Sequence, residues 1–229
     1  MSAIAERLQS VRAQVAAAAE RVGRAPDAVR LVAVSKNHSV EAVAEAAAAG
    51  QVLFGENRVQ EAAGKVSALP DHLDWHLIGH LQTNKVRKAL PLFRMIESVD
   101  SAELAHAIDR IAEELGLIVP VLLQVNAAED PAKYGFTAES VRETLPGLLR
   151  LPRLQIRGLM TIPAFTEDAE GARPAFSRLR ELRDALEHEQ GIRLPELSMG
   201  MSHDFPVAIA EGATLVRVGT AIFGEREKA

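Results

Sequence analysis

Residues 31–55 read LVAVSKNHSVEAVAEAAAAGQVLFG and contain one strand–helix–strand unit. The apolar runs at 31–35 and 51–55 are short and do not alternate with polar residues, which is typical of parallel strands that are covered on both faces. Between the two runs, Ser39 can cap a helix that stops at Gly50. The unit predicts an α/β fold.

The same alternation continues along the chain. Six further apolar runs predict strands at residues 74–79, 93–98, 119–126, 154–162, 195–200 and 214–219. Eight units in 229 residues predict a closed (β/α)8 barrel, a TIM barrel, and residues 2–22 add an extra N-terminal helix. A doubly wound open sheet is the alternative, but no GxGxxG follows the first strand. No Gly-, Ser- or Pro-rich linker divides the chain, so we expect a single domain over residues 1–229.

Polar residues predict where three of the helices begin. Asn57 begins a pattern that resembles a capping box, and Asp100 with Glu103 resembles the start of another helix. Ser202 can cap a helix after the seventh strand. Asn57 is more often a helix cap than a ligand contact, and both roles stay open.

The composition excludes several classes of function. The chain has 26 Lys and Arg against 31 Asp and Glu, a net charge of −5, and no basic block, so nucleic acid and anionic membrane find no electrostatic footprint. Cysteine is absent, which excludes disulfides and thiolate sites and fits a reducing compartment. Glu6 and Arg7 lie where a signal peptide needs apolar residues. We expect a soluble, cytoplasmic protein.

Two loops near the C-terminus resemble a phosphate site. Barrel enzymes carry their active sites at the C-terminal ends of the strands, and phosphate is commonly held after strands 7 and 8. The seventh strand leads into SMGMSHD, with Ser198, Gly200 and Ser202, and the eighth leads into VGTAIFG, with Gly219 and Thr220. Hydroxyls and closely approaching glycine backbone suit phosphate. Taken together, the two loops are about equally consistent with a phosphate site and with an ordinary helix cap and turn.

Lys36 is a cation at the end of the first predicted strand, and Arg217 is a cation within the last. Lys36 shares a strand face with Val32 and Val34, so it rises toward the mouth if those valines fill the barrel. Its amine could then attack a carbonyl, although a solvated surface lysine is the commoner case. Arg217 lies in an apolar strand and needs an acceptor, either a carboxylate or a ligand.

The sequence predicts no metal site. His76 and His80 are four residues apart, which on a strand separates them by ~13 Å, too far to share one metal ion. The HExxH motif is absent. Tyr134, the only tyrosine, is expected in a surface turn after the fifth strand.

Six motifs occur in order between residues 30 and 226: AVSKNHSVEAVAEA, FGENRVQEA, WHLIGHLQTNK, GLMTIPA, LSMGMSHDF and GATLVRVGTAIFGER. With them the chain resembles the pyridoxal phosphate homeostasis protein family, often called the YggS or PROSC family. The resemblance implies a barrel related to the N-terminal domain of bacterial alanine racemase, with pyridoxal 5′-phosphate (PLP) bound as an internal aldimine.

The resemblance also implies a set of cofactor-binding residues at the strand ends: Lys36, Asn57, Ser198, Met199, Ser202, Arg217, Gly219 and Thr220. Lys36 would carry the aldimine, with Asn57 close by. Ser202, Gly219 and Thr220 would hold the phosphate, with Ser198 or Met199 near them. Arg217 would face the pyridine nitrogen.

These residues favour binding of PLP without catalysis. Arginine only donates hydrogen bonds, so it would leave the ring nitrogen unprotonated and the cofactor a poor electron sink. Racemisation would need a second acid or base, which alanine racemases take from a C-terminal domain for which this chain has no room. We therefore expect a non-catalytic protein of PLP (vitamin B6) homeostasis, with PLP-dependent racemase as the alternative. An aldolase that condenses Lys36 with a sugar phosphate is the third hypothesis.

The expected partners follow from the same reading. PLP is the ligand, PLP-dependent apoenzymes are the implied recipients, and neither nucleic acid nor membrane is expected to bind. The sequence does not identify the recipients. It shows no interface stripe, and a monomer is the expectation.

Overall fold

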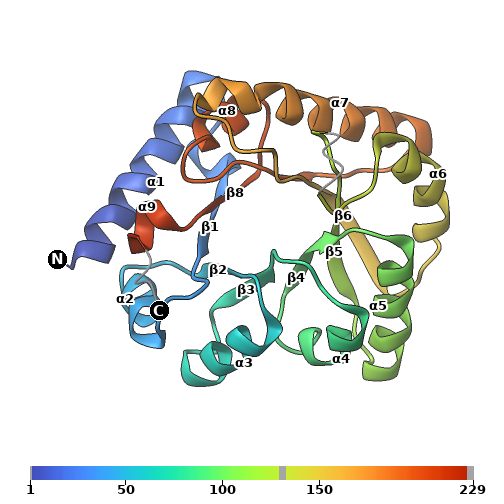
Figure 1. Ribbon diagram of the computed structural model, residues 1–229, viewed down its shortest axis with the longest axis horizontal. Helices are drawn as coiled ribbons and strands as arrows, with labels where there is room; N and C mark the ends of the chain where they lie inside the picture. Colours follow the sequence, from blue (N-terminus) through green and yellow to red (C-terminus); the bar gives the residue numbers. More distant parts are fainter. Residues whose placement is uncertain (1, 129–132, 226–229) are drawn as a thin grey trace.

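The computed structural model describes residues 2–128 and 133–225 as a parallel barrel of eight strands (Figure 1). The strands follow the order β1 to β8, and β8 pairs back onto β1. Each predicted strand is present, which confirms the TIM barrel and excludes the open sheet. Their bounds are β1 Arg30–Val34, β2 Leu53–Glu56, β3 Asp74–Leu77, β4 Met95–Val99, β5 Val119–Gln124, β6 Leu154–Met160, β7 Glu196–Ser198 and β8 Leu215–Val218.

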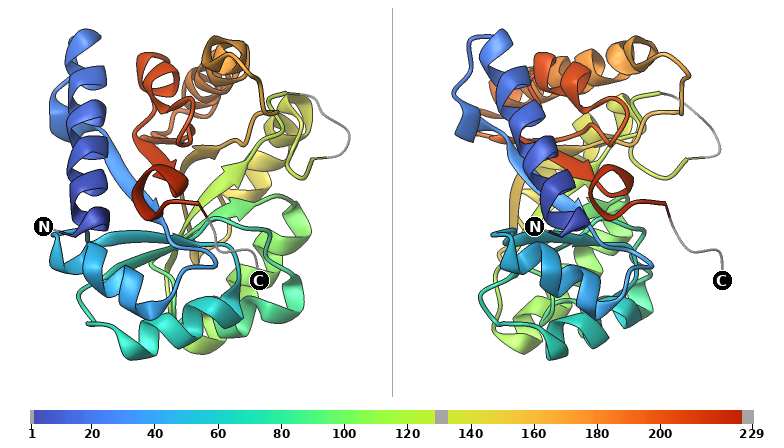
Figure 2. Two further views of the ribbon diagram at one scale, coloured as in Figure 1. Left: turned by 60° about the vertical axis from the view of Figure 1, so that its left-hand side comes forward. Right: turned by 90° about the vertical axis from the view of Figure 1, so that its left-hand side faces the viewer.

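Helices surround the strands on the outside of the barrel (Figure 2). The predicted N-terminal helix is confirmed as α1, which packs beside α2, α8 and α9. The α-helical bounds are α1 Ala3–Arg21, α2 Val40–Ala48, α3 Val59–Ala68, α4 Val86–Ala89, α5 Ala102–Leu115, α6 Ala138–Leu148, α7 Arg173–Gln190, α8 Phe205–Ala210 and α9 Thr220–Phe223. Within the described residues, every helix is too short or too polar to cross a bilayer.

Arginines bind the ends of three helices to the N-terminal helix region. The last carbonyls of a helix have no partner within that helix, so a donating side chain stabilises them. Three guanidinium groups supply this bond: Arg7 to Ile222 O (2.7 Å, α9), Arg12 to Gly50 O (2.7 Å, after α2) and Arg24 to Ile209 O (3.0 Å, α8). α1 is thus bonded as well as packed to the barrel.

The core has two parts, inside and outside the barrel. The large outer part lies between strands and helices. The inner part is a small apolar layer in which Val32 and Leu215 meet Met95, Leu122 and Met160. Val32 therefore faces the interior as its strand parity predicts, and the next residues on that face, Val34 and Lys36, line the cavity at the mouth.

The predicted helix starts are right in one case and wrong in three. Ser39 Oγ accepts from Ala42 N–H and caps α2, as expected. Asn57 does not cap α3, because the cap position falls on Arg58 and Asn57 lines the cavity instead. Because Asn57 lines the cavity, helix α3 begins one residue later than its capping pattern predicts.

For α5 and α8, the cap lies one or two residues after the predicted residue. Ser101, not Asp100, caps α5 through its hydroxyl, because the Asp100 carboxylate pairs with His80. Ser202 does not cap α8, because the cap position is Asp204, whose side chain accepts from Met201 N–H. Both serine and aspartate suit a cap, so the sequence does not distinguish adjacent candidates.

Candidate functional site

A cavity of about 310 Å³ opens at the C-terminal ends of the strands. Its lining comes from the ends of β1, β2, β3, β6, β7 and β8, so it forms only when the barrel closes. Six of the predicted site residues line it: Lys36, Asn57, Ser202, Arg217, Gly219 and Thr220. These six are separated by up to 184 positions in the sequence, and the fold brings them to one place.

Ser198 and Met199 do not line this cavity. Both are fully buried. Met199 faces the helices and packs in the outer core, whereas Ser198 faces the barrel interior below the cavity. Successive residues of a strand point to opposite faces, so the two cannot share one environment.

A layer of polar side chains lies between the apolar interior and the cavity. Arg217 Nη1 donates to Ser198 Oγ at 2.5 Å, and Ser198 Oγ donates to Glu97 Oε2 at 2.5 Å. Glu97 Oε1 lies 2.6 Å from His76 Nδ1. Arg217 Nη2 also donates to Thr161 O at 2.8 Å. The acceptors of Arg217 are thus a hydroxyl and a carbonyl, and the carboxylate lies one hydroxyl further away.

Burial and charge together set the ionisation of this layer. Burial opposes ionisation of Glu97, but the hydrogen bond to His76 and the charges of His76 and Arg217 outweigh it and lower the pKa of Glu97. Burial lowers the pKa of Arg217, while Glu97 and Asp204 act in the opposite direction. Arginine stays protonated nevertheless, because its unperturbed pKa is above about 12. The layer therefore presents a fixed positive charge to the cavity floor.

Lys36 lies on a tight turn directly after β1. His38 N–H donates to Ser35 O at 3.0 Å, which closes the turn. Asn37 follows Lys36 with φ +61°, the left-handed region that asparagine adopts more readily than most residues. The strand ends at Val34, and Lys36 stands on the turn one residue before the left-handed Asn37, so that the half-buried lysine lines the mouth.

Asn57 has a polar atom without a partner at the cavity. Its Oδ1 is buried and accepts no hydrogen bond from the described residues. Gly79 packs against the same residue, and a Cβ at this position would lie 2.4 Å from Asn57 O. A bound molecule with a hydroxyl or amine could satisfy Oδ1, as buried polar groups require.

The loops after β7 and β8 form the opposite wall. A Cβ at Gly219 would lie 3.1 Å from Val34 O, so the glycine lets β8 approach β1 closely just below Thr220. Gly200 has φ +93°, and a Cβ there would lie 2.6 Å from the Ala208 side chain. The hydroxyls of Ser202 and Thr220 belong to the same lining as Lys36.

Several residues of the site are not among those predicted from the sequence. Glu97 joins the polar layer, and His38, Phe165 and His203 line the cavity. Strand alternation puts Glu97 on the same face as Met95, and the structure shows that this face points into the barrel. No sequence pattern indicates Phe165, which lies in an irregular segment after β6.

Other predicted features fall outside the cavity. His76 and His80 contact different carboxylates, those of Glu97 and Asp100. Tyr134 is 63% exposed and stacks on the His80 ring, with centroids 4.4 Å apart, which confirms its surface position.

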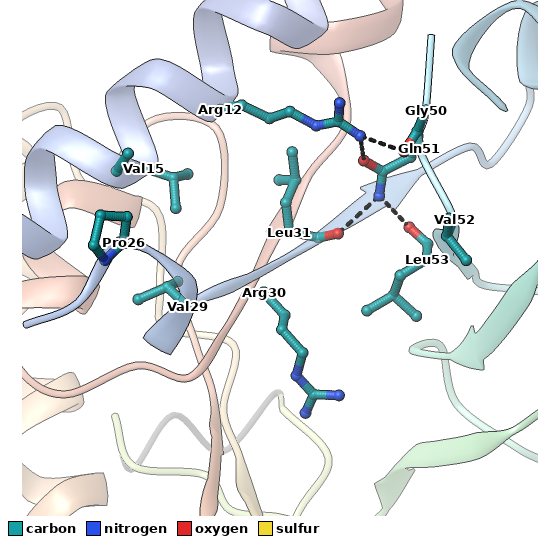
Figure 3. Close-up of a pocket in the computed structure, with 11 residues that line it drawn as sticks. Arg12, Val15, Pro26, Val29, Arg30, Leu31, Gly50, Gln51, Val52 and Leu53 are labelled. Atoms are coloured by element: carbon teal, nitrogen blue, oxygen red, sulfur yellow. Dashed lines mark hydrogen bonds between the residues drawn. The ribbon is translucent and has the colours of Figure 1, made fainter. Parts of the chain in front are cut away.

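A second hollow lies at the N-terminal ends of β1 and β2 (Figure 3). Lys36 follows the other end of β1. The amide of Gln51 donates to Leu31 O and Leu53 O, and Arg12 donates to Gln51 Oε1. These bonds tie the two strands together where they begin. The N-terminal face of such barrels serves stability, so we assign this hollow no ligand.

The chain is similar both to a family model and to curated relatives. The family model for the alanine racemase N-terminal domain matches residues 7–227, which defines the class of barrel. Curated relatives named pyridoxal phosphate homeostasis protein are 45% identical in Aquifex aeolicus and 44% identical in Pseudomonas aeruginosa. The matches cover 97% and 99% of this chain and 98% and 97% of the relatives. The chain belongs to the pyridoxal phosphate homeostasis protein family.

Solved structures agree with this placement. PipY of Synechococcus elongatus, in a structure with PLP bound, is 47% identical, with a TM-score of 0.85 over 96% of this chain and 100% of PipY. Alanine racemase of Clostridium difficile is 18% identical, with a TM-score of 0.73 over 97% of this chain and 58% of the racemase. At that identity the racemase shares the fold alone.

Proposed function

We propose that this chain binds PLP in the cavity at the barrel mouth, with Lys36 as the attachment point, and that it serves PLP homeostasis without catalytic turnover. The observation that carries the proposal is the shared cavity of Lys36, Arg217 and Thr220. It combines an amine, a fixed cation and a hydroxyl-bearing loop. The relatives' names and the PLP-bound PipY structure supply the identity of the ligand.

Each lining residue has a role suited to its chemistry. PLP supplies an aldehyde, which condenses with a primary amine and releases one water. Lys36 supplies that amine. Ser202, Gly219 and Thr220 surround the phosphate with hydroxyls and open backbone. The orphaned Oδ1 of Asn57 accepts a hydrogen bond from the bound molecule.

Arg217 would face the ring nitrogen and would keep it unprotonated, because a guanidinium can only donate. Ser198 acts through Arg217, which it holds by the hydrogen bond to Nη1. Met199 supports the wall from the outer core. A ring held in this way stabilises a substrate carbanion poorly, which supports a binding role.

The proposal extends to the domain organisation, oligomeric state, compartment and partners of the chain. Residues 1–229 act as one PLP-binding domain, a monomer in the cytoplasm that delivers PLP to PLP-dependent apoenzymes. The lack of cysteine fits a reducing compartment. Light scattering after size-exclusion chromatography tests the monomer directly, and a dimer mass would overturn it.

The decisive experiment is to trap PLP on the chain. Wild type incubated with PLP should develop a visible absorption band that borohydride removes, and the Lys36 peptide should gain the mass of reduced PLP. Lys36→Ala should lose both signals while its far-UV circular dichroism stays unchanged. Lys88→Ala, an exposed lysine on α4, is the matched control and should keep both. A colourless wild type, or label on another lysine, would overturn the proposal.

A further inference from the structure

A buried ionic cluster lies directly behind the turn that carries Lys36. We call it the Lys65 clamp, which consists of Lys65 and Glu61 on α3, Glu56 at the end of β2 and Ser35 after β1. Lys65 Nζ donates to Glu56 Oε1 (2.6 Å), Glu61 Oε1 (2.7 Å) and Ser35 O (2.7 Å). The three donors of the ammonium group are thereby matched by three acceptors.

The clamp holds the chain on both sides of Lys36. On the N-terminal side, Ser35 O accepts from Lys65 and Ser35 Oγ donates to Glu56 Oε1 at 2.6 Å. On the C-terminal side, Asn37 N–H donates to Glu61 Oε1 at 2.5 Å. Both neighbours of Lys36 are therefore fixed to one cluster.

The left-handed conformation of Asn37 needs such support. A residue other than glycine is strained in that region and persists there where surrounding contacts fix it. The bond from Asn37 N–H to Glu61 is a charge-assisted contact of that kind. If this bond were lost, the turn could relax and move Lys36 away from the cavity that it lines.

Stability alone is a poor reason for this cluster. Lys65 is 4% exposed and Glu56 is fully buried. Burial raises the pKa of Glu56, against the hydrogen bonds of Lys65 and Ser35. Replacing a buried ion pair by apolar side chains is often neutral or stabilising, so burying these charges adds little to the free energy of unfolding. What the Lys65 clamp does provide is a fixed geometry for the turn that carries Lys36.

We propose that Lys65 and Glu61 are positioning residues for Lys36: they fix its two neighbouring peptide groups and so direct its amine into the cavity. The inference rests on the proposed function, since it gives Lys36 the role of attachment point. It adds residues that touch neither the cavity floor nor the phosphate loops. Removal of the clamp should slow covalent attachment without weakening the rest of the PLP site.

Glu61→Ala is the decisive variant, because the Glu61 side chain is 21% exposed and Lys65 keeps Glu56 Oε1 and Ser35 O as acceptors. Relative to wild type, the rate at which the borohydride-sensitive band develops should fall about 10- to 100-fold, because a ~1 Å misplacement of a reacting group can cost about 100-fold. Affinity for pyridoxine 5′-phosphate, which lacks the aldehyde, should stay within about twofold, since it reports only the non-covalent contacts. Hydrogen exchange at the Asn37 amide of the apoprotein should accelerate.

Two controls separate positioning from a general loss of charge or structure. Glu61→Gln keeps an oxygen acceptor for Asn37 N–H and should restore most of the rate. Glu41→Ala removes an exposed glutamate from the first turn of the neighbouring helix α2 and should behave as wild type. Lys65→Met should show the same kinetic defect as Glu61→Ala, together with a lower thermal midpoint.

The outcomes distinguish this inference from the proposed function. If wild type develops the band and Glu61→Ala matches its rate, the clamp does not position Lys36 and the inference is wrong. Equal losses for PLP and pyridoxine 5′-phosphate would also overturn it, because they would show general damage to the site. A wild type without the band would overturn the proposed function itself.

Discussion

At the scale of single residues, the cavity places the amine that would attach PLP and the cation that would contact its ring on different parts of its lining. Lys36 stands on a turn at one wall, while Arg217 rises from the floor with its charge balanced through Ser198 by Glu97. A hydroxyl between cation and carboxylate lets both stay charged without direct contact. The guanidinium then keeps donors for a ligand.

Thr220 is expected to contact the phosphate end of the ligand. Thr220→Val removes one hydroxyl from an exposed position at nearly constant shape, so affinity for PLP should fall about three- to tenfold, the scale of one hydrogen bond. Titration with pyridoxal, which lacks the phosphate, is the comparison. Equal losses for PLP and pyridoxal would place Thr220 elsewhere in the site.

Glu97 should make the protein less stable in acid. Its pKa is lowered in the folded chain, so its stabilising contribution is present above the unfolded value of about 4.3 and is lost as pH falls through the folded value. The slope of unfolding free energy against pH should therefore be positive below that unfolded value and smaller in Glu97→Gln. Urea titrations at several pH values measure both slopes, and parallel slopes would contradict the assignment.

At the scale of elements, strand periodicity predicted more than capping residues did. All eight strands and the inward face of β1 follow from short apolar runs and alternation. Alternation within the predicted strand 195–200 would also have separated Met199 from Ser198, because neighbouring residues of a strand face opposite ways. Helix starts at Asn57 and Asp100 were wrong because their side chains turn toward the cavity and toward His80. Such tertiary partners leave no local signal.

Gly158 on β6 is expected to be essential for strand pairing. It lies where β5 and β6 shift register, and a Cβ there would lie 1.8 Å from Glu196 O of β7. Gly158→Ala should lower the free energy of unfolding by about 3 kcal/mol or more, since backbone must move. Gly64→Ala on an exposed face of α3, with open space around it, should instead raise it by about 0.5–1 kcal/mol. Chemical denaturation of both variants checks the pair.

At the scale of the whole molecule, α1 is part of the barrel's stability and not an appendage. Leu8 is fully buried in the outer core, so Leu8→Ala should lower the free energy of unfolding by about 2–5 kcal/mol. The unfolding transition measured by the fluorescence of Trp75 should therefore move to lower denaturant concentration. Trp75 lies on β3, is 3% exposed and is distant from Leu8 in sequence. Gln9→Ala, at an exposed position of the same helix, should leave the midpoint unchanged. An unshifted Trp75 transition in Leu8→Ala would show that α1 unfolds separately.

The closure of β8 onto β1 also affects how the chain is made. Four residue pairs, from Arg30–Leu215 to Ala33–Val218, join the two strands. A ribosome releases β1 before β8, so in the interval between them β1 has one open edge and α1 lacks its contacts with α8 and α9. An open edge can pair with other chains. Nascent chains stalled before β8 are therefore the form most exposed to aggregation and to chaperones.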